Sequence, residues 1–279
     1  MQAVVLALAA SLSYGVGDFI GGVETRRTSL WTVLVVTQTT GLLLMLLIVL
    51  VRGVPLPREV VLPALVAGLL MVVFATAYFK ALAIGMISIV GPVVALGVAV
   101  PVIVGFARGE RPSTLQVAGI AVAVAGVVLA SREKTADEQR KGTSRASIAL
   151  ALLAGAAYGI VMVLYARGAD ADPYWTITLS RLTSTVIFLA AFAVVRPGLK
   201  AGRRDIAPLL TTGVCGVAAY TLFSVATTFA YLSIVSVLGS LYPVFMALLA
   251  YVFLHERLTR TQLAGVVAAL AGVALISAG

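Results

Sequence analysis

Two charged residues fall inside long apolar runs, and they are the first candidates for chemistry. Asp18 lies in SYGVGDF and Arg181 in TLSRLTS. A charge at the centre of a membrane helix costs about 2.5–3.5 kcal/mol on insertion scales. Asp18 could take up a proton or bind a cation, and the permanently charged Arg181 could bind a carboxylate or phosphate. The alternatives are an interfacial Asp18 where its helix ends and an Arg181 side chain that reaches the nearby surface.

Three uncharged side chains could complete such a site. Tyr14 and Tyr158 lie well inside their apolar runs, where they could line a cavity for an amphipathic solute or belong to an interfacial belt. Gln38 is adjacent to Thr37, the residue 144 positions before Arg181. It either faces the same site or forms hydrogen bonds between helices. The predicted substrate-binding residues are Arg181, Tyr14, Tyr158 and Gln38, with Asp18 as the residue for proton or cation coupling.

The composition indicates a membrane protein. Hydrophobic residues make up 61% of the 279 positions and charged residues 11%, against about 25% charged in soluble domains. The single Cys215 and single His255 exclude a disulfide framework and a His/Cys metal cluster within one chain. The net charge of +9 comes from residues in short loops, which indicates topology control and no nucleic-acid partner. The expected partners are the bilayer and a small solute, with a monomer or homodimer and no cofactor beyond possible proton coupling.

The chain repeats itself. Residues 109–131 match residues 255–277 at an offset of 146, and earlier pairs such as Tyr14-Gly15 and Tyr158-Gly159 match at 144. Duplicated membrane bundles often meet at a substrate site near the bilayer midplane. We therefore expect a first five-helix repeat at 1–131, a charged linker at 132–146 and a second repeat at 147–279.

Runs of about 20 apolar residues are long enough to span a bilayer as helices. The fold class expected is an all-α membrane protein with ten transmembrane helices in two five-helix repeats. Because five is odd, the second repeat must enter the membrane in the opposite orientation. The first run lacks a basic leader and is expected to be a span. The expected spans are 3–22, 30–51, 60–82, 86–106, 114–131, 147–166, 174–195, 207–229, 233–254 and 260–277.

Lys and Arg residues distribute unevenly between the two sides of this arrangement. Fourteen of the 20 lie in or beside loops on the side of the central linker, five lie on the other side, and Arg181 lies within a span. The positive-inside rule then places the linker in the cytoplasm and both termini outside.

Helix depth argues against a direct Asp18–Arg181 ion pair. The helices that carry them run in the same direction, and the two residues lie near opposite ends of their spans. A rise of 1.5 Å per residue leaves on the order of 14 Å between them across the bilayer.

An intramembrane protease is the main enzyme alternative, because Gly15-Val16-Gly17-Asp18 reads as GxGD. Such catalysis needs two carboxylates that share a proton. Asp18 is the only acidic residue expected inside a span, so we predict that the protein is not an enzyme.

Glu110 and Glu256 are expected to be structural. Each precedes a capping-box pattern, Ser113-x-x-Gln116 or Thr259-x-x-Gln262, at the start of a helix, where a carboxylate also favours the helix dipole. Small residues of the fifth and tenth spans, such as Gly126 and Gly272, predict close helix contact. Pro92 and Pro243 are expected to kink or interrupt the fourth and ninth spans and free carbonyls that line a pathway.

Taken together, these residues give the chain a resemblance to the drug/metabolite transporter superfamily, in its ten-helix EamA-type branch. The Tyr14-Gly15 and Tyr158-Gly159 pairs resemble the aromatic-Gly motif of the first helix. Residues 240–259 resemble the helix with a central proline and a Gly-Glu-Arg-like turn, although His255 replaces the usual Gly. The first copy keeps Gly109-Glu110-Arg111 but carries Gly97 and Pro101 in place of a proline aligned with Pro243.

The resemblance implies a secondary transporter that moves small organic solutes, often outward, and whose fifth and tenth helices pack together. Many members are drawn with both termini in the cytoplasm, contrary to the charge distribution. The expected function is export of metabolites such as amino acids, or of drugs, across the cytoplasmic membrane by alternating access. A lipid-linked or polyprenyl-phosphate carrier is the alternative.

Overall fold

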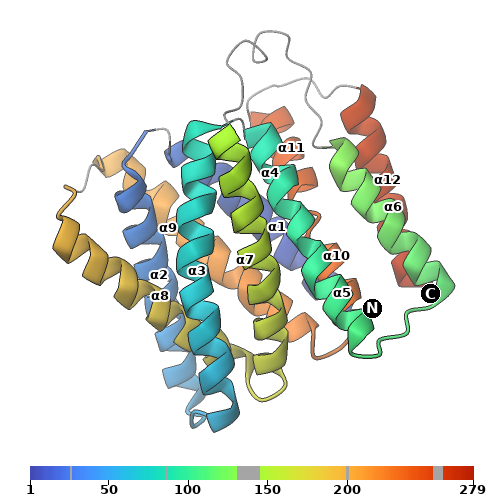
Figure 1. Ribbon diagram of the computed structural model, residues 1–279, viewed down its shortest axis with the longest axis horizontal. Coiled ribbons are helices and arrows are strands. Elements are labelled where there is room, and N and C mark those ends of the chain that lie inside the picture. Colours follow the sequence, from blue (N-terminus) through green and yellow to red (C-terminus); the bar gives the residue numbers. More distant parts are fainter. Residues whose placement is uncertain (26, 86, 131–144, 199–200, 254–259) are drawn as a thin grey trace.

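The computed structural model describes residues 1–25, 27–85, 87–130, 145–198, 201–253 and 260–279, and the regular structure in these ranges is helical (Figure 1). Six helices are long and apolar enough to cross a membrane. They are α1 (Gln2–Glu24), α2 (Leu30–Arg52), α3 (Arg58–Ile84), α7 (Arg145–Ala169), α8 (Pro173–Val195) and α9 (Arg203–Ala226).

Shorter apolar helices lie where the other four spans were expected. The fourth span is interrupted into α4 (Ile87–Ala95), the 3₁₀ turn η1 (Leu96–Val98) and α5 (Ala99–Ala107). The ninth is divided into α10 (Leu232–Gly239) and α11 (Tyr242–Phe253). The fifth and tenth are α6 (Thr114–Ala130) and α12 (Arg260–Ala278).

Prolines mark both interruptions, but only one at the predicted place. Pro243 is the second residue of α11, where a missing N–H costs nothing. Pro92 lies within α4, so it is not the point at which the fourth span is interrupted. The change of helix type comes at Leu96–Val98, before Pro101, which removes the N–H that would bond the Gly97 carbonyl.

The helices pair across the two parts of the chain. Helix α1 packs on α9, and α3 packs on α7 in the same manner. Helices α2 and α8 pack antiparallel, because Arg52 at the end of α2 meets Asp172 at the start of α8. Figure 1 shows both termini at one end of the molecule, while α6 ends and α7 begins at the opposite end.

Helices α6 and α12 form a separate antiparallel pair of very close approach, as the small-residue pattern predicted. A Cβ at Gly126 would collide with the backbone of Ala269, and one at Gly272 would meet Ala123 at 2.5–2.7 Å. The predicted capping box at the start of α6 is present: the Ser113 N–H donates to Gln116 Oε1 (2.9 Å) and the Gln116 N–H to Ser113 Oγ (3.1 Å). Glu256 and Thr259 lie outside the described residues.

Glu110 is structural, but it stabilises a different helix from the one expected. The N–H of Leu232 donates to Glu110 Oε1 at 2.8 Å, and the N–H of Ser233 donates to Oε2 at 3.1 Å. The carboxylate therefore caps α10, which follows it by more than 100 residues, and not α6. Gly105 leaves room for it, since a Cβ there would collide with the carboxylate.

Candidate functional site

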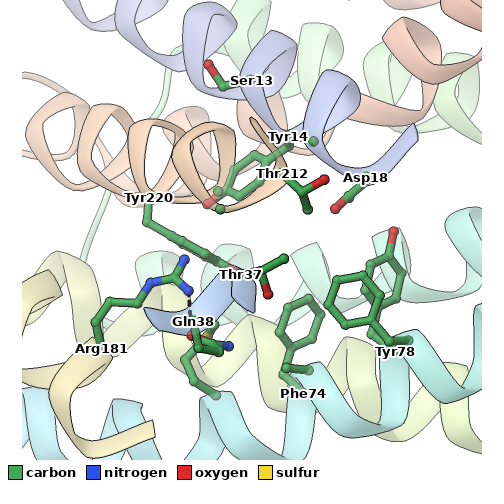
Figure 2. A pocket seen from close by; sticks show the side chains of 16 residues that line it. Ser13, Tyr14, Asp18, Thr37, Gln38, Phe74, Tyr78, Arg181, Thr212 and Tyr220 are labelled. Atoms are coloured by element: carbon green, nitrogen blue, oxygen red, sulfur yellow. Dashed lines mark hydrogen bonds between the residues drawn. The ribbon is translucent and has the colours of Figure 1, made fainter. Parts of the chain in front are cut away.

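A polar cavity lies between α1, α2, α3, α8 and α9 (Figure 2). Its free space is about 490 Å³, including the part open to solvent. Its lining combines charged, hydroxyl and aromatic side chains with small residues. They are Ser13, Tyr14, Gly17, Asp18, Thr37, Gln38, Met71, Phe74, Ala75, Tyr78, Phe79, Arg181, Thr212, Gly213, Gly216 and Tyr220.

Arg181 reaches into this cavity from α8 and is only 4% exposed, so it does not extend to the surface. Its Nη1 donates to Gln38 Oε1 at 2.5 Å, and its guanidinium carbon lies 5.1 Å from the centre of the Tyr220 ring. Nε is buried without a partner. Two glycines leave space around it: a Cβ at Gly41 or Gly216 would lie within 3.5 Å of the guanidinium.

Gln38 meets Arg181 between α2 and α8. Each is the ninth residue of a 23-residue helix, although the offset of 144 that pairs Trp31-Thr32 with Trp175-Thr176 pairs Arg181 with Thr37. The two side chains form a hydrogen bond with each other where α2 and α8 cross. The backbone carbonyl of Gln38 also accepts a bond from Thr185 Oγ1 at 3.3 Å. Gln38 thus joins the helices and lines the cavity at once, which are the two roles considered from the sequence.

Asp18 lies in the interior of α1, which continues for six residues to Glu24. Figure 2 shows Asp18 and Tyr78 on one side of the cavity and Arg181 on the other. The two charged residues form no ion pair with each other among the described contacts. The Tyr78 hydroxyl is directed toward the Asp18 carboxylate without forming a full hydrogen bond.

A second, smaller pocket of about 260 Å³ adjoins the cavity, and we call it the tyrosine pocket. Tyr14 is at its centre, with the ring of Tyr158 at 6.0 Å and that of Tyr220 at 5.2 Å, both edge-on. Both interrupted spans reach it, through Val94 of α4 and Tyr242 of α11. Its lining residues are Tyr14, Asp18, Phe74, Tyr78, Val94, Tyr158, Tyr220 and Tyr242.

The five predicted site residues therefore lie around these two connected spaces, Tyr158 around the smaller one only. Their roles in binding and coupling stay predictions. Sequence reasoning missed Phe74 and Tyr242, although Tyr242 directly precedes Pro243, whose position at a helix interruption was a usable signal. Tyr231, the residue before α10, is 44% exposed and is not among the lining residues of either space.

Glu24 is a buried acidic residue at the end of α1, two residues beyond the expected span 3–22. It is the last residue of α1, is 4% exposed and has Oε2 buried without a partner. The sequence placed it in a loop because two glycines, Gly21 and Gly22, precede it. Both glycines are helical, and Gly21 allows α1 to approach Thr212 of α9.

An ion pair joins α2 and α8 at the end that carries the termini. Arg52 Nη2 and Nη1 lie 2.9 and 3.1 Å from the two oxygens of Asp172, and the guanidinium stacks on Tyr174 at 4.1 Å. Asp172 also accepts the Trp175 N–H (2.8 Å), and the Trp175 indole donates to the Val54 carbonyl (2.9 Å). The polar groups at this end of α2 and α8 therefore have hydrogen-bond partners, whereas the cavity contains polar atoms without partners.

Long apolar helices around a buried polar cavity define a multi-pass membrane protein that handles a solute. A model of the EamA-like transporter family matches residues 1–132 and again residues 145–278. The chain belongs to the EamA-like transporter family.

Individual relatives are more distant. The chain is 35% identical over 102 residues to a probable terminal-alkyne amino-acid exporter of Streptantibioticus cattleyicolor, and 25% identical over 120 residues to an uncharacterized transporter of Archaeoglobus fulgidus. These matches cover 36% and 37% of this chain and 34% and 44% of the relatives, so the chain spans less than half the length of either. A solved crystal structure matches the fold with a TM-score of 0.79 at 19% identity, covering 99% of this chain and 97% of that one.

Proposed function

We propose that the protein is a secondary transporter that exports small organic metabolites such as amino acids across the cytoplasmic membrane. The observation that carries this proposal is the cavity with Arg181 on one side and Asp18 on the other, enclosed by helices from both parts of the chain. A solute held there contacts α1, α2 and α3 together with α8 and α9, so relative movement of these groups would change its access.

Alternating access between two inverted five-helix repeats is the proposed mechanism. The reciprocal packing of α1 on α9 and of α3 on α7 supports it, as do the two interrupted spans beside the cavity. Transporters of this architecture bind solutes where discontinuous helices meet near the midplane. Termini on one end of the molecule are what ten spans require.

Arg181 is the proposed anchor for a carboxylate. Its Nη1 is held by Gln38, which fixes the guanidinium and leaves Nε without a partner. A solute carboxylate could accept hydrogen bonds from the edge of the Arg181 guanidinium that Gln38 does not bind, which includes Nε. These charge-assisted hydrogen bonds would form in a site shielded from water. Asp18, on the opposite side, is the proposed group for proton coupling.

Solute counterflow in proteoliposomes tests this function. Proteoliposomes that contain the purified protein are loaded with unlabelled amino acids. Uptake of a radiolabelled amino acid by these vesicles is compared with uptake by vesicles that contain Arg181→Gln. We expect saturable exchange that the variant loses at equal reconstituted amounts. Absence of exchange for every amino acid and organic anion, with translocation of a polyprenyl-phosphate lipid instead, would favour the lipid-carrier alternative.

A further inference from the structure

The tyrosine pocket contains three hydroxyl groups whose hydrogen bonding is incomplete. The phenol oxygens of Tyr14, Tyr78 and Tyr158 are all buried, and none forms a hydrogen bond of full geometry. The Tyr14 and Tyr158 hydroxyls face each other, and the Tyr78 hydroxyl faces the Asp18 carboxylate. Most buried polar side-chain atoms in proteins have a full partner, so these hydroxyls have hydrogen-bonding capacity left for a bound group.

The size of the pocket restricts that group. Its free space, which includes the part open to solvent, is about 260 Å³, roughly half that of the main cavity. The space in it that a water-sized group can occupy is only about 20 Å³, and about 10–15 Å³ is enough for one such group. The pocket suits the head group of a solute whose remainder lies in the main cavity, with which it shares five lining residues, including Asp18 and Tyr220.

The charge of the pocket indicates the sign of the head group. Asp18 is the ionisable carboxylate among its described lining residues, and Arg181 lines only the main cavity. The rings of Tyr14, Tyr158 and Tyr220 present aromatic surface, which attracts cations. The Tyr242 hydroxyl is already engaged, because it donates to the Gly91 carbonyl at 3.2 Å.

We propose that the tyrosine pocket is the subsite for a primary ammonium group of the transported solute. An ammonium has three N–H donors and no acceptor, and it would donate to the Asp18 carboxylate and to tyrosine hydroxyls whose hydrogen bonding is incomplete. The subsite is separate from Arg181, so a solute with an ammonium at one end and a carboxylate at the other fits both. This assignment rests on the proposed transport function, which it deepens.

Thermal stability of the detergent-purified protein, titrated with n-butylammonium or n-butyrate in sodium-free buffer, tests the subsite. The variants are Tyr78→Phe, Tyr158→Phe and Asp18→Asn. Tyr165→Phe is the matched control, because Tyr165 is fully buried outside the pocket and its hydroxyl bonds Ser180 at 2.9 Å.

We expect n-butylammonium to raise Tm of the native protein, and its apparent Kd to weaken about tenfold or more in each pocket variant. The n-butyrate response should be retained in these variants. The unliganded Phe variants should keep most of the native stability, because neither hydroxyl forms a hydrogen bond of full geometry. Tyr165→Phe should be less stable yet respond normally to the amine.

Three results would overturn the assignment. They are an unchanged amine response in all pocket variants, an equal loss in Tyr165→Phe, and stabilisation by Na⁺ instead of the amine with the same dependence on the variants. Each leaves the transport function standing if native counterflow of amino acids persists. An intact amine response without any counterflow would instead contradict the proposed function.

Discussion

Two helix pairs, α6 with α12 and α2 with α8, each combine one helix from either part of the chain. They differ in whether the residues at their contact are the same in both helices. In α6 and α12, Gly126 and Gly272 are both glycine and each packs on the opposite backbone. In α2 and α8, the ninth residues are Gln38 and Arg181, and they bond to each other beside the cavity. The α6–α12 contact needs a small residue in both helices, whereas the α2–α8 contact needs a charge in only one of them.

A similar difference is visible in α1 and α7. At the offset of 144 that aligns Tyr14 with Tyr158, Asp18 corresponds to Met162, which is fully buried and apolar. The tyrosines remain paired edge-on while the carboxylate occurs once. The positive and negative groups of the cavity thus come from opposite parts of the chain, and an equivalent scaffold supports an asymmetric site.

Arg181→Gln makes the two residues of the α2–α8 contact identical and is expected to have the largest effect. Truncation of a buried, hydrogen-bonded charge costs about 2–5 kcal/mol, so counterflow of a carboxylate solute should fall at least about thirtyfold. The double variant Gln38→Arg, Arg181→Gln returns one guanidinium to the same crossing and should recover part of the rate. A double variant no better than the single one at equal stability would show that the two positions are not interchangeable.

Gly126→Leu tests the conserved pair. The side chain cannot fit against Ala269, and overpacking of a close contact costs about 1–3 kcal/mol. We expect a lower Tm, with transport per folded molecule close to native. Ala125→Leu is the control, because Ala125 is exposed on the same helix. A normal Tm for Gly126→Leu would contradict the structural role given to this pair.

Asp18→Asn should have an intermediate effect, on both solute binding and coupling. An amide of similar shape cannot take up or release a proton, so uptake driven by a pH gradient should fall about tenfold even at saturating solute. Counterflow without a gradient should need more solute, because the ammonium loses its carboxylate partner, but should persist at saturation. Met162→Asn is the matched substitution on α7. Uptake by Asp18→Asn that still follows the pH gradient would exclude this carboxylate from coupling.

The sequence was sufficient for the helices but not for their long-range partners. Apolar runs located nearly every helix end within about three residues, since span length is set by the bilayer. Local patterns also predicted the α6 capping box and the α6–α12 contact. The partners of Glu110 and Arg52 lie 122 and 120 residues away, and spacing along one helix contains no information about them.

The cavity residues show the same limit. Charges in apolar runs indicated Asp18 and Arg181, because a buried charge needs a reason to be there. Phe74 gave no signal, since aromatic residues are common in apolar helices, and Tyr242 had only the indirect signal of the proline that follows it. The hydrogen bond between Gln38 and Arg181 required the structure, because the repeat offset of 144 places Thr37 opposite Arg181 and only the side-chain contact identifies Gln38 as its partner.

Arg52→Gln is expected to have the smallest effect. Its side chain is 31% exposed, and ion pairs near the surface contribute about 0–1 kcal/mol. Asp172 should continue to cap α8 through Trp175, so Tm should change little. If the pair also closes this end of the molecule, counterflow should accelerate up to about fivefold; a large loss of Tm would instead show that the pair is mainly structural.

Solute protection of an engineered thiol tests most directly whether the cavity between Asp18 and Arg181 is the transport site. Thr37→Cys in a Cys215→Ser background places the thiol in the cavity, where the Thr37 hydroxyl bonds only its own helix (2.7 Å to the Val33 carbonyl). Val51→Cys, at a position 79% exposed on the same helix, is the control. We predict that transported solute slows maleimide labelling at position 37 and leaves position 51 unchanged. If saturating solute leaves the rate of maleimide labelling at position 37 unchanged, the cavity between Asp18 and Arg181 is not the transport site.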